Sequence, residues 1–175
     1  MTRDIREVGT KISFYDFKIF DTAGIDPFSK IKLKRDMTSN SISKVYEGNL
    51  VIFLLDGRSG ILKDDFEVSD KLRKNNSQVI LAINKCEGNY KKEIFSDSFS
   101  LGFGEPILIS AEHGLGLDEL KEAILGRSQL NIDRKQVSLE VDDNSNTKSN
   151  KVKLPLNMSI VGRPNSGKST LFNLL

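Results

Sequence analysis

The chain has 175 residues, about one ordinary domain with a short remainder, and 26 Lys and Arg against 24 Asp and Glu leave a formal net charge of +2. This balance gives no electrostatic case for DNA or an anionic membrane as the main partner, because such binding needs a clear excess of positive charge. The single cysteine excludes an internal disulfide, and the single histidine excludes a multi-histidine metal site. No segment approaches the ~18 apolar residues of a membrane-spanning helix and the first residues are polar, which predicts a soluble, cytoplasmic protein.

The first half of the chain alternates apolar and polar segments. Residues 10–20 are rich in β-branched and aromatic side chains with a polar break at Tyr15 and Asp16, which predicts one strand end, a tight turn and the start of another strand. Residues 49–57 form an apolar run typical of a strand buried on both faces of a parallel sheet. Two polar segments are long enough to be crossover helices, 29–47 and 63–76.

The same strand pattern returns twice in the next part of the chain, over 78–85 and 105–111. A further helix is predicted over 117–126, where apolar residues fall at helical spacing. Alternating strands and helices predict an α/β domain with a mostly parallel sheet. Ligands of such sheets bind at the carboxyl ends of the strands, which is where the motifs DTAG, NKCE and SAEHG lie.

The composition changes at about residue 127. The segment 127–153 has few large apolar residues, and its run of Asp, Asn, Ser and Lys cannot bury enough surface to offset the entropy of ordering it. It is therefore predicted to be a polar, flexible linker. Residues 154–175 then supply a short apolar strand, a glycine-bounded loop and the start of a helix.

The loop GRPNSGKS, from Gly162 to Ser169, fits the pattern G-x-x-x-x-G-K-[ST] between a strand and a helix. In that context backbone N–H groups and the helix amino terminus face a phosphate, Lys168 reaches the outer phosphates and the Ser169 hydroxyl holds magnesium. The alternative is a glycine-rich turn with an exposed lysine. The predicted nucleotide-binding residues here are Gly162, Arg163, Pro164, Asn165, Ser166, Gly167, Lys168, Ser169 and Thr170.

The motif DTAGI follows the second predicted strand. Its Asp21 is placed as a carboxylate that contacts nucleotide-bound magnesium, and the Gly24 N–H can meet a terminal phosphate. Alone the motif could be an ordinary turn, but a phosphate loop in the same chain favours the functional interpretation. The predicted binding residues are Asp21, Thr22, Ala23, Gly24 and Ile25.

The motif NKCE closes the strand over 78–85 and has the chemistry of base recognition. The Glu87 carboxylate can accept from two neighbouring N–H groups of guanine, which discriminates against adenine. Asn84 can bridge to the phosphate loop, Lys85 can lie over the base plane, and Cys86 is a spacer rather than a nucleophile. The alternative is that Lys85 and Glu87 are solvated loop charges.

The motif SAEHG ends the strand over 105–111 and begins with Ser110. The Ala111 N–H could meet the base carbonyl of a bound nucleotide. His113 is expected to have a loop or partner-contact role rather than a catalytic one, because phosphoryl transfer depends mainly on positioning and electrostatics.

Together these motifs resemble the TRAFAC-class P-loop GTPases, and among them the bacterial GTPases that carry two G domains in tandem. MTRD at 1–4 resembles the switch I threonine motif, DTAGI the start of switch II, and NKCEG and SAEHGLGLDEL the two base-contact motifs, while GRPNSGKSTLFN resembles the phosphate loop of a second G domain. The motif order is therefore second to fifth, and then first of the next domain.

The resemblance implies a three-layer P-loop NTPase (G-domain) fold with a permuted-like motif order. Residues 1–126 correspond to a first G domain without its own initial strand and phosphate loop, 127–153 to the linker, and 154–175 to the opening of the second G domain. This order also predicts that the sequence is part of a longer reading frame in which Met1 is internal.

The resemblance also implies individual roles. Thr2 matches the switch I threonine that closes on magnesium, so that Ser169, Thr2 and Asp21 are the implied metal ligands. Asn165 matches a loop asparagine associated with potassium-stimulated hydrolysis, and Lys168, Asn165 and Thr2 are the implied catalytic residues. Ile25 stands where Ras-like proteins carry a water-orienting glutamine. Glu87 stands where an Asp is commoner.

The implied function is a GTP-binding and GTP-hydrolysing switch in assembly of the large ribosomal subunit. Its ligands are GTP or GDP, magnesium and potassium, and its partners are large-subunit particles rather than membranes or DNA. Two alternatives are a nucleotide-binding or ribosome-docking module without turnover, and an ATP-using P-loop enzyme, against which NKCE argues.

The place of residues 154–175 follows from the fold that the resemblance implies. In a G domain the first strand lies centrally, and without it two apolar strands would expose unpaired edges. The linker has a random-coil span of roughly 30 Å, so the strand at 156–161 is expected to fill that place. The exchange could occur within one chain or between two chains of a dimer.

Overall fold

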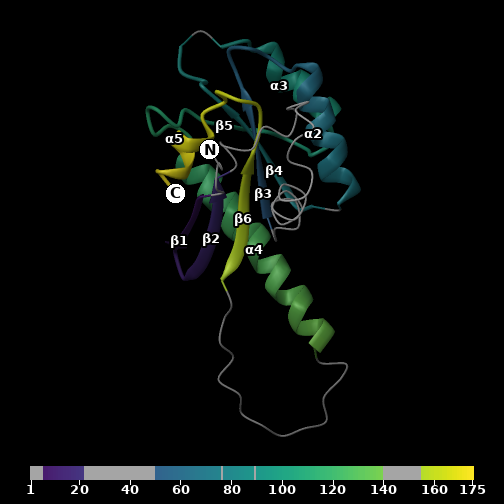
Figure 1. Ribbon diagram of the computed structural model, residues 1–175, viewed down its shortest axis with the longest axis vertical. Helices are drawn as coiled ribbons and strands as arrows, with labels where there is room; N and C mark the ends of the chain where they lie inside the picture. Colours follow the sequence, from purple (N-terminus) through teal and green to yellow (C-terminus); the bar gives the residue numbers. More distant parts are fainter. Residues whose placement is uncertain (1–5, 22–49, 76, 89, 140–154) are drawn as a thin grey trace, which may run out of the picture.

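The computed structural model describes residues 6–21, 50–75, 77–88, 90–139 and 155–175, with the backbone alone described over 129–139 (Figure 1). Several sequence predictions lie outside these residues, namely Thr2, the motif positions Thr22, Ala23, Gly24 and Ile25, and the helix over 29–47. Within the described residues, no helix combines the length and the apolar character that a bilayer crossing requires.

A β-hairpin opens the described part of the chain. Strand β1 (Arg6–Ile12) pairs antiparallel with strand β2 (Tyr15–Asp21), and the turn places Ser13 in the left-handed region with φ of 56°. The hairpin confirms the predicted strand, tight turn and strand, but the turn lies at Ser13 and Phe14, and the polar pair Tyr15 and Asp16 begins β2.

The remaining strands run parallel to β2. They are β3 (Leu50–Asp56), β4 (Val79–Asn84), β5 (Ile107–Leu108) and β6 (Leu156–Val161). The order across the six-stranded sheet is β1-β2-β6-β3-β4-β5. The sheet is thus mixed but mostly parallel, which confirms the predicted α/β class.

Strand β6 lies inside the sheet although it comes last in the chain. It pairs in parallel with β2 on one side and with β3 on the other, so that Met158 is opposite Ile19 and also opposite Leu50. Figure 1 shows this strand, drawn in yellow, between the purple hairpin and the blue β3. The edges that β2 and β3 turn toward each other are therefore both paired.

Helices cover both faces of the sheet. Side chains alternate along β3, so that Val51, Phe53 and Leu55 join the core under α2 (Lys63–Lys74), while Ile52 and Leu54 join the core under α4 (Leu117–Leu139). The short helix α5 (Lys168–Phe172) follows the loop after β6 and packs Leu171 into this second core. The result is the three-layer arrangement that the sequence predicted.

Helix α4 corrects the predicted boundary of the linker. It runs unbroken to Leu139, so residues 127–139, assigned to the linker from their polarity, are helical. The segment contains no proline, and Gln, Arg, Lys and Leu are good helix formers. The helix is also anchored by Arg127, whose guanidinium donates to the Val79 carbonyl at the start of β4. Low apolar content therefore did not mark the end of the helix.

Two further elements differ from the prediction. Strand β5 is only Ile107–Leu108, shorter than the predicted 105–111, because Ser110 instead makes an isolated bridge with Leu115. A helix α3 (Glu93–Ser98) and a 3₁₀ turn (Phe99–Leu101) occupy a segment for which no element was predicted. Their buried Ile94 and Leu101 close the core under α2.

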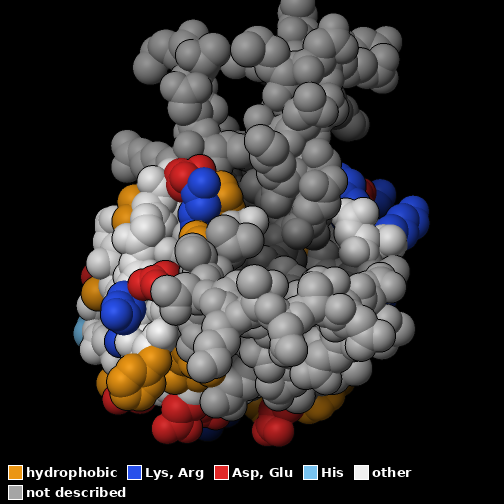
Figure 2. All heavy atoms as spheres, turned by 90° about the horizontal axis from the view of Figure 1, so that it is seen from below, with side chains coloured by type: hydrophobic (Ala, Val, Ile, Leu, Met, Phe, Trp, Pro, Cys, Tyr) orange, Lys and Arg blue, Asp and Glu red, His pale blue; other side chains and the backbone are white. Residues whose placement is uncertain are grey.

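Much of the face drawn in Figure 2 belongs to residues outside the described ranges. Among its coloured side chains, acidic, basic and hydrophobic groups are all visible around the margin.

We expect the substitution Ile160→Ala to lower the free energy of unfolding by about 2–4 kcal/mol, because this β6 side chain is fully buried and its truncation leaves a cavity. Urea denaturation followed by circular dichroism measures the change. Val8→Ala is the control, since that β1 side chain is 48% exposed, and its effect should stay within about 0.5 kcal/mol. Equal losses for the two variants would contradict a central place for β6.

Candidate functional site

The carboxyl ends of the parallel strands meet at one edge of the sheet, at the top of Figure 1. Four connections gather there: 57–62 after β3, 85–88 after β4, 109–116 after β5 and the glycine-bounded loop 162–167 after β6. Open parallel sheets bind ligands at this edge. The sequence motifs therefore converge in space although they lie far apart in the chain.

The loop 162–167 turns tightly between β6 and α5. Gly167 has φ of 95°, and a Cβ added there would lie 2.2 Å from Nδ2 of Asn84. A Cβ on Gly162 would lie 2.3 Å from the Leu54 carbonyl oxygen. Both glycines are therefore required by close approach to neighbouring strands, and they hold the loop against the sheet edge.

Lys168 lies across its own loop. It is only 5% exposed, and its Nζ donates to the carbonyl oxygens of Gly162 at 2.9 Å and Arg163 at 2.7 Å. Beneath it, the Ser166 hydroxyl is buried and has no hydrogen-bond partner among the described residues. A buried ammonium group and a buried hydroxyl without a partner are donors suited to an anion such as phosphate.

Asn84 joins three of the four connections. Its side chain is buried, Nδ2 donates to the Ser166 carbonyl at 2.8 Å, and Oδ1 accepts from the Ala111 N–H at 2.9 Å. The bridge from Asn84 to the phosphate loop that the sequence anticipated is present. Its second bond, to Ala111, was not anticipated, and it fixes the SAEHG segment to the same amide. The Ala111 N–H that the sequence predicted to meet a base carbonyl is instead donated to Asn84.

Lys85 crosses from the NKCE segment to the glycine-bounded loop. Its backbone is left-handed, with φ of 66°, and its Nζ lies 2.6 Å from both the Asn165 carbonyl oxygen and Asp56 Oδ2. Burial alone would raise the pKa of Asp56, but the hydrogen bonds from Lys85 and from the Arg58 and Ser59 N–H groups bring it below its ordinary value. Asp56 is thus an ionised anchor for Lys85.

Sequence reasoning missed Asp56 as a member of this site. The available signal was the Asp-Gly pair directly after a strand buried on both faces, because a carboxylate at that position is placed at the ligand-binding edge.

Glu87 lies at the far side of the edge from the glycine-bounded loop. Its side chain is 15% exposed, and Oε1 accepts from the Arg58 guanidinium at 2.6 Å. The Ser110 hydroxyl, the backbone N–H and Arg58 hold the pKa of Glu87 below its ordinary value. The carboxylate is therefore ionised at neutral pH and available as an acceptor.

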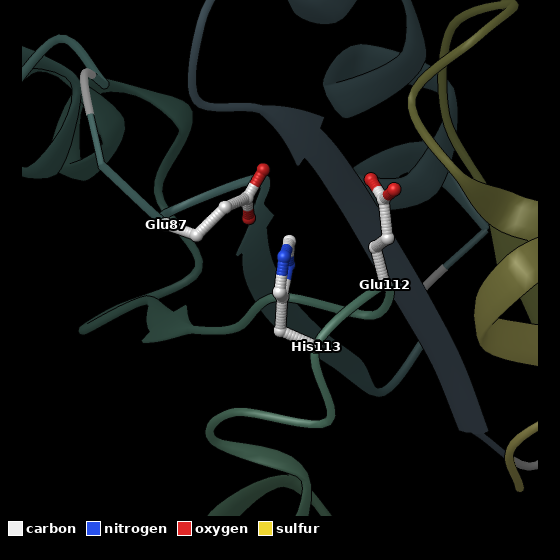
Figure 3. A group of neighbouring side chains, drawn as sticks. All are labelled: Glu87, Glu112 and His113. Carbon is white, nitrogen blue, oxygen red and sulfur yellow. The ribbon is translucent and has the colours of Figure 1, made fainter.

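Glu112 and His113 border Glu87 (Figure 3). The potential ligand atoms of the three side chains lie within 4.8 Å of one another, and the His113 ring projects between the two carboxylates. The His113 Nδ1 is 3.1 Å from the Ser110 hydroxyl. Because Glu112 and His113 are exposed and Glu87 is paired with Arg58, we describe the three as the rim of the site and assign no metal to them.

Cys86 faces away from this chemistry. Its Sγ lies 3.2 Å from the Ile83 carbonyl oxygen, it contacts the core under α2, and burial raises its pKa to about 11. A thiol with that pKa is a poor nucleophile at neutral pH, as expected for a spacer.

Arg163 connects the glycine-bounded loop to helix α2. Its guanidinium lies 2.9 Å from the Asp65 carboxylate and also donates to the Gly60 carbonyl at 2.9 Å. Asp65 is fully buried, and it accepts from the Leu62 N–H at the start of α2. Burial raises the pKa of Asp65 against the lowering effects of the Leu62 N–H and of Arg163. The assignment of Arg163 to nucleotide binding stays a prediction for its place in the loop, and its side chain makes this ion pair.

The other predicted site residues are placed in part. Asp21 ends β2 opposite Ile160 of β6, which puts the start of DTAGI beside the start of the glycine-bounded loop, and its side chain is outside the described atoms. Ser169 and Thr170 lie in the first turn of α5, and Pro164 lies within the loop.

Comparison with known proteins agrees with this geometry. The family described as "50S ribosome-binding GTPase" matches residues 1–85. A "GTPase Der" of Thermosipho melanesiensis is 36% identical over 176 residues, which cover 99% of this chain and 37% of that protein. A "GTPase Der" of a Bradyrhizobium strain is 37% identical over 175 residues, which cover 100% of this chain and 37% of that protein.

The chain has an α/β fold with a mostly parallel sheet, and its residues 1–85 are similar to that GTPase family. Over nearly its whole length, the chain is similar to part of the proteins named GTPase Der. The chain spans about 37% of the length of these curated relatives.

We expect Gly167→Ala to destabilise the chain more than Gly104→Ala. Both glycines have positive φ, 95° and 85°, so alanine is strained at both by roughly 1–2 kcal/mol. Only at Gly167 does the new Cβ also meet a neighbour, Asn84 Nδ2 at 2.2 Å, whereas nothing lies within 4 Å of the Cβ position at Gly104. Urea denaturation should show at least about 1 kcal/mol more loss for Gly167→Ala. Identical midpoints would contradict the described packing of the loop on Asn84.

Proposed function

We propose that the chain forms a guanine-nucleotide site, with triphosphate on the loop 162–167 and the base beside Glu87. The observation that carries this proposal is the double hydrogen bond of Asn84. One buried side chain holds the Ser166 carbonyl of the phosphate half and the Ala111 N–H of the base half, 82 positions and 27 positions away in the sequence. The two halves are therefore held as one preorganised site.

The phosphate half offers charge and donors without further rearrangement of the backbone. On binding, the Lys168 ammonium exchanges its bonds to Gly162 and Arg163 for bonds to phosphate oxygens, which are stronger because both partners are charged. The Ser166 hydroxyl supplies a second buried donor. Stabilising negative charge on the transferred phosphoryl group is the main task of such a site.

The base half discriminates by its acceptor. The ionised Glu87 carboxylate would accept from the two adjacent N–H groups of guanine. The Ala111 N–H is donated to Asn84, so it holds the SAEHG segment in place beside the base. Adenine lacks the matching donors, so it would leave the carboxylate unpaired. Lys85, fixed by Asp56 and Asn165, would lie along the base.

A magnesium ion fits the donors at the phosphate half. Ser169 offers a hydroxyl, and Asp21 and Thr2 are proposed to complete the set, all of them oxygen donors of the kind that magnesium prefers. When bound, the ion neutralises charge on the phosphates. By resemblance, Asn165 is proposed to serve a potassium ion, and hydrolysis of GTP is proposed as the reaction.

We expect Lys168→Ala to weaken binding of a fluorescent GTP analogue by about 10- to 100-fold, because it removes a charged bond to the outer phosphates. The measurement is a fluorescence titration with magnesium. Lys18→Ala is the matched control, since that lysine pairs with Glu7 on the hairpin, away from the site. Excess ATP should not displace the analogue.

Two results of that titration and one separate assay decide between the functions. Unchanged affinity in Lys168→Ala would show that the loop is not used, and displacement by ATP would favour an ATP-using site. Saturable binding of the analogue without phosphate release from GTP, measured in a separate phosphate assay, would favour a module without turnover. The mass of the complex from light scattering distinguishes one chain from an exchanged dimer.

The proposed partner is the large ribosomal subunit, since the matched family is described as binding 50S ribosomes. We expect the chain to sediment with purified 50S subunits through a sucrose cushion, more strongly with a non-hydrolysable GTP analogue than with GDP. Equal recovery with either nucleotide, or recovery equal to that of the chain alone, would contradict a nucleotide-controlled ribosomal role.

A further inference from the structure

The connection after β3 carries a cation that none of the sequence motifs includes. Arg58 follows Asp56 and Gly57, and its backbone is fixed because the Asp56 carboxylate accepts from the Arg58 N–H at 2.9 Å and from the Ser59 N–H at 3.3 Å. The same carboxylate holds Lys85 at 2.6 Å. The Arg58 backbone and the Lys85 side chain are therefore both bound to the Asp56 carboxylate.

The Arg58 guanidinium reaches across to the base half of the site. Its Nη2 lies 2.6 Å from Glu87 Oε1, while its own side chain is 56% exposed and that of Glu87 only 15%. Other charged or titratable groups beside Glu87 in the described residues are Cys86, Glu112 and His113. Arg58 is therefore the described cation that contacts the Glu87 carboxylate.

A glutamate needs such a contact more than an aspartate would. It has one more rotatable bond, so a free Glu87 carboxylate would spread over more orientations than the shorter side chain that is commoner at this position. A carboxylate accepts two neighbouring N–H groups only when its plane is aligned with both donors. A fixed guanidinium on one oxygen restricts that plane.

We propose that Arg58 is a specificity-determining positioning residue, which orients Glu87 so that its carboxylate accepts both the ring N–H and the 2-amino group of a guanine base. The inference rests on the proposed function and identifies the residue that makes the site selective for guanine. Arg58 itself acts through Glu87 and touches neither the phosphates nor the phosphate loop in the described contacts.

The test compares GTP with inosine triphosphate, which keeps the ring N–H and lacks the 2-amino group. Affinities of both are measured by competition against a fluorescent GTP analogue for the wild-type chain, Arg58→Ala, Arg58→Lys and Lys18→Ala. We expect Arg58→Ala to reduce the ratio of GTP to inosine triphosphate affinity by roughly 3- to 10-fold, as for loss of a partly exposed ion pair. Arg58→Lys should lie between, and Lys18→Ala should match the wild type.

The second part of the test repeats the comparison in the Glu87→Ala variant. In that background Arg58→Ala should cause no further change in the ratio, because its effect passes through the carboxylate. An unchanged ratio in Arg58→Ala, or a full effect that persists without Glu87, would overturn the assignment while leaving guanine binding intact. Absence of saturable binding of either nucleotide to the wild-type chain would instead overturn the proposed function, and this inference with it.

Discussion

The central place of β6 is the constraint on which the rest of the structure depends. Without β6, the facing edges of β2 and β3 would have no hydrogen-bond partners. Strand β6 pairs with both of these apolar strands. Its burial also fixes where the following loop emerges, at the carboxyl edge between the β2 and β3 ends. The backbone pairing of β6 therefore sets the position of the glycine-bounded loop independently of the contacts that the side chains of the loop make.

Asn84 and Arg163 then hold the glycine-bounded loop against other parts of the chain. Asn84 ties it to the base half through two buried hydrogen bonds, while Arg163 ties it to the start of α2 through the fully buried Asp65. Removing one partner of such a buried pair leaves an uncompensated charge, so the pair acts as a strict geometric constraint. The two contacts hold the loop residues Ser166 and Arg163, and Lys168 donates to the carbonyls of Gly162 and Arg163 in the same loop.

Much of this arrangement could be predicted from the sequence. Continuous apolar runs identified β3 and β4, and the glycine spacing identified the loop because close backbone approach excludes side chains there. The β-branched and aromatic residues identified the hairpin, but its turn lies two residues before the predicted polar break. The length of α4 could not be predicted from apolar content, since Arg127 anchors the helix by a hydrogen bond rather than by burial of apolar surface. Nor could Asp56, Asp65 and Arg58 be assigned, because their partners are distant in sequence and only the fold brings them together.

The position of β6 in the chain has a consequence for how the molecule forms. Among the described residues, five strands precede the one that pairs with both β2 and β3, and the contact of Arg163 with Asp65 spans 98 positions. Such distant contacts slow folding, because the entropy of closing the loop must be met before the contacts stabilise it. In this chain the facing edges of β2 and β3 stay open until β6 pairs with them, and an open apolar edge favours aggregation.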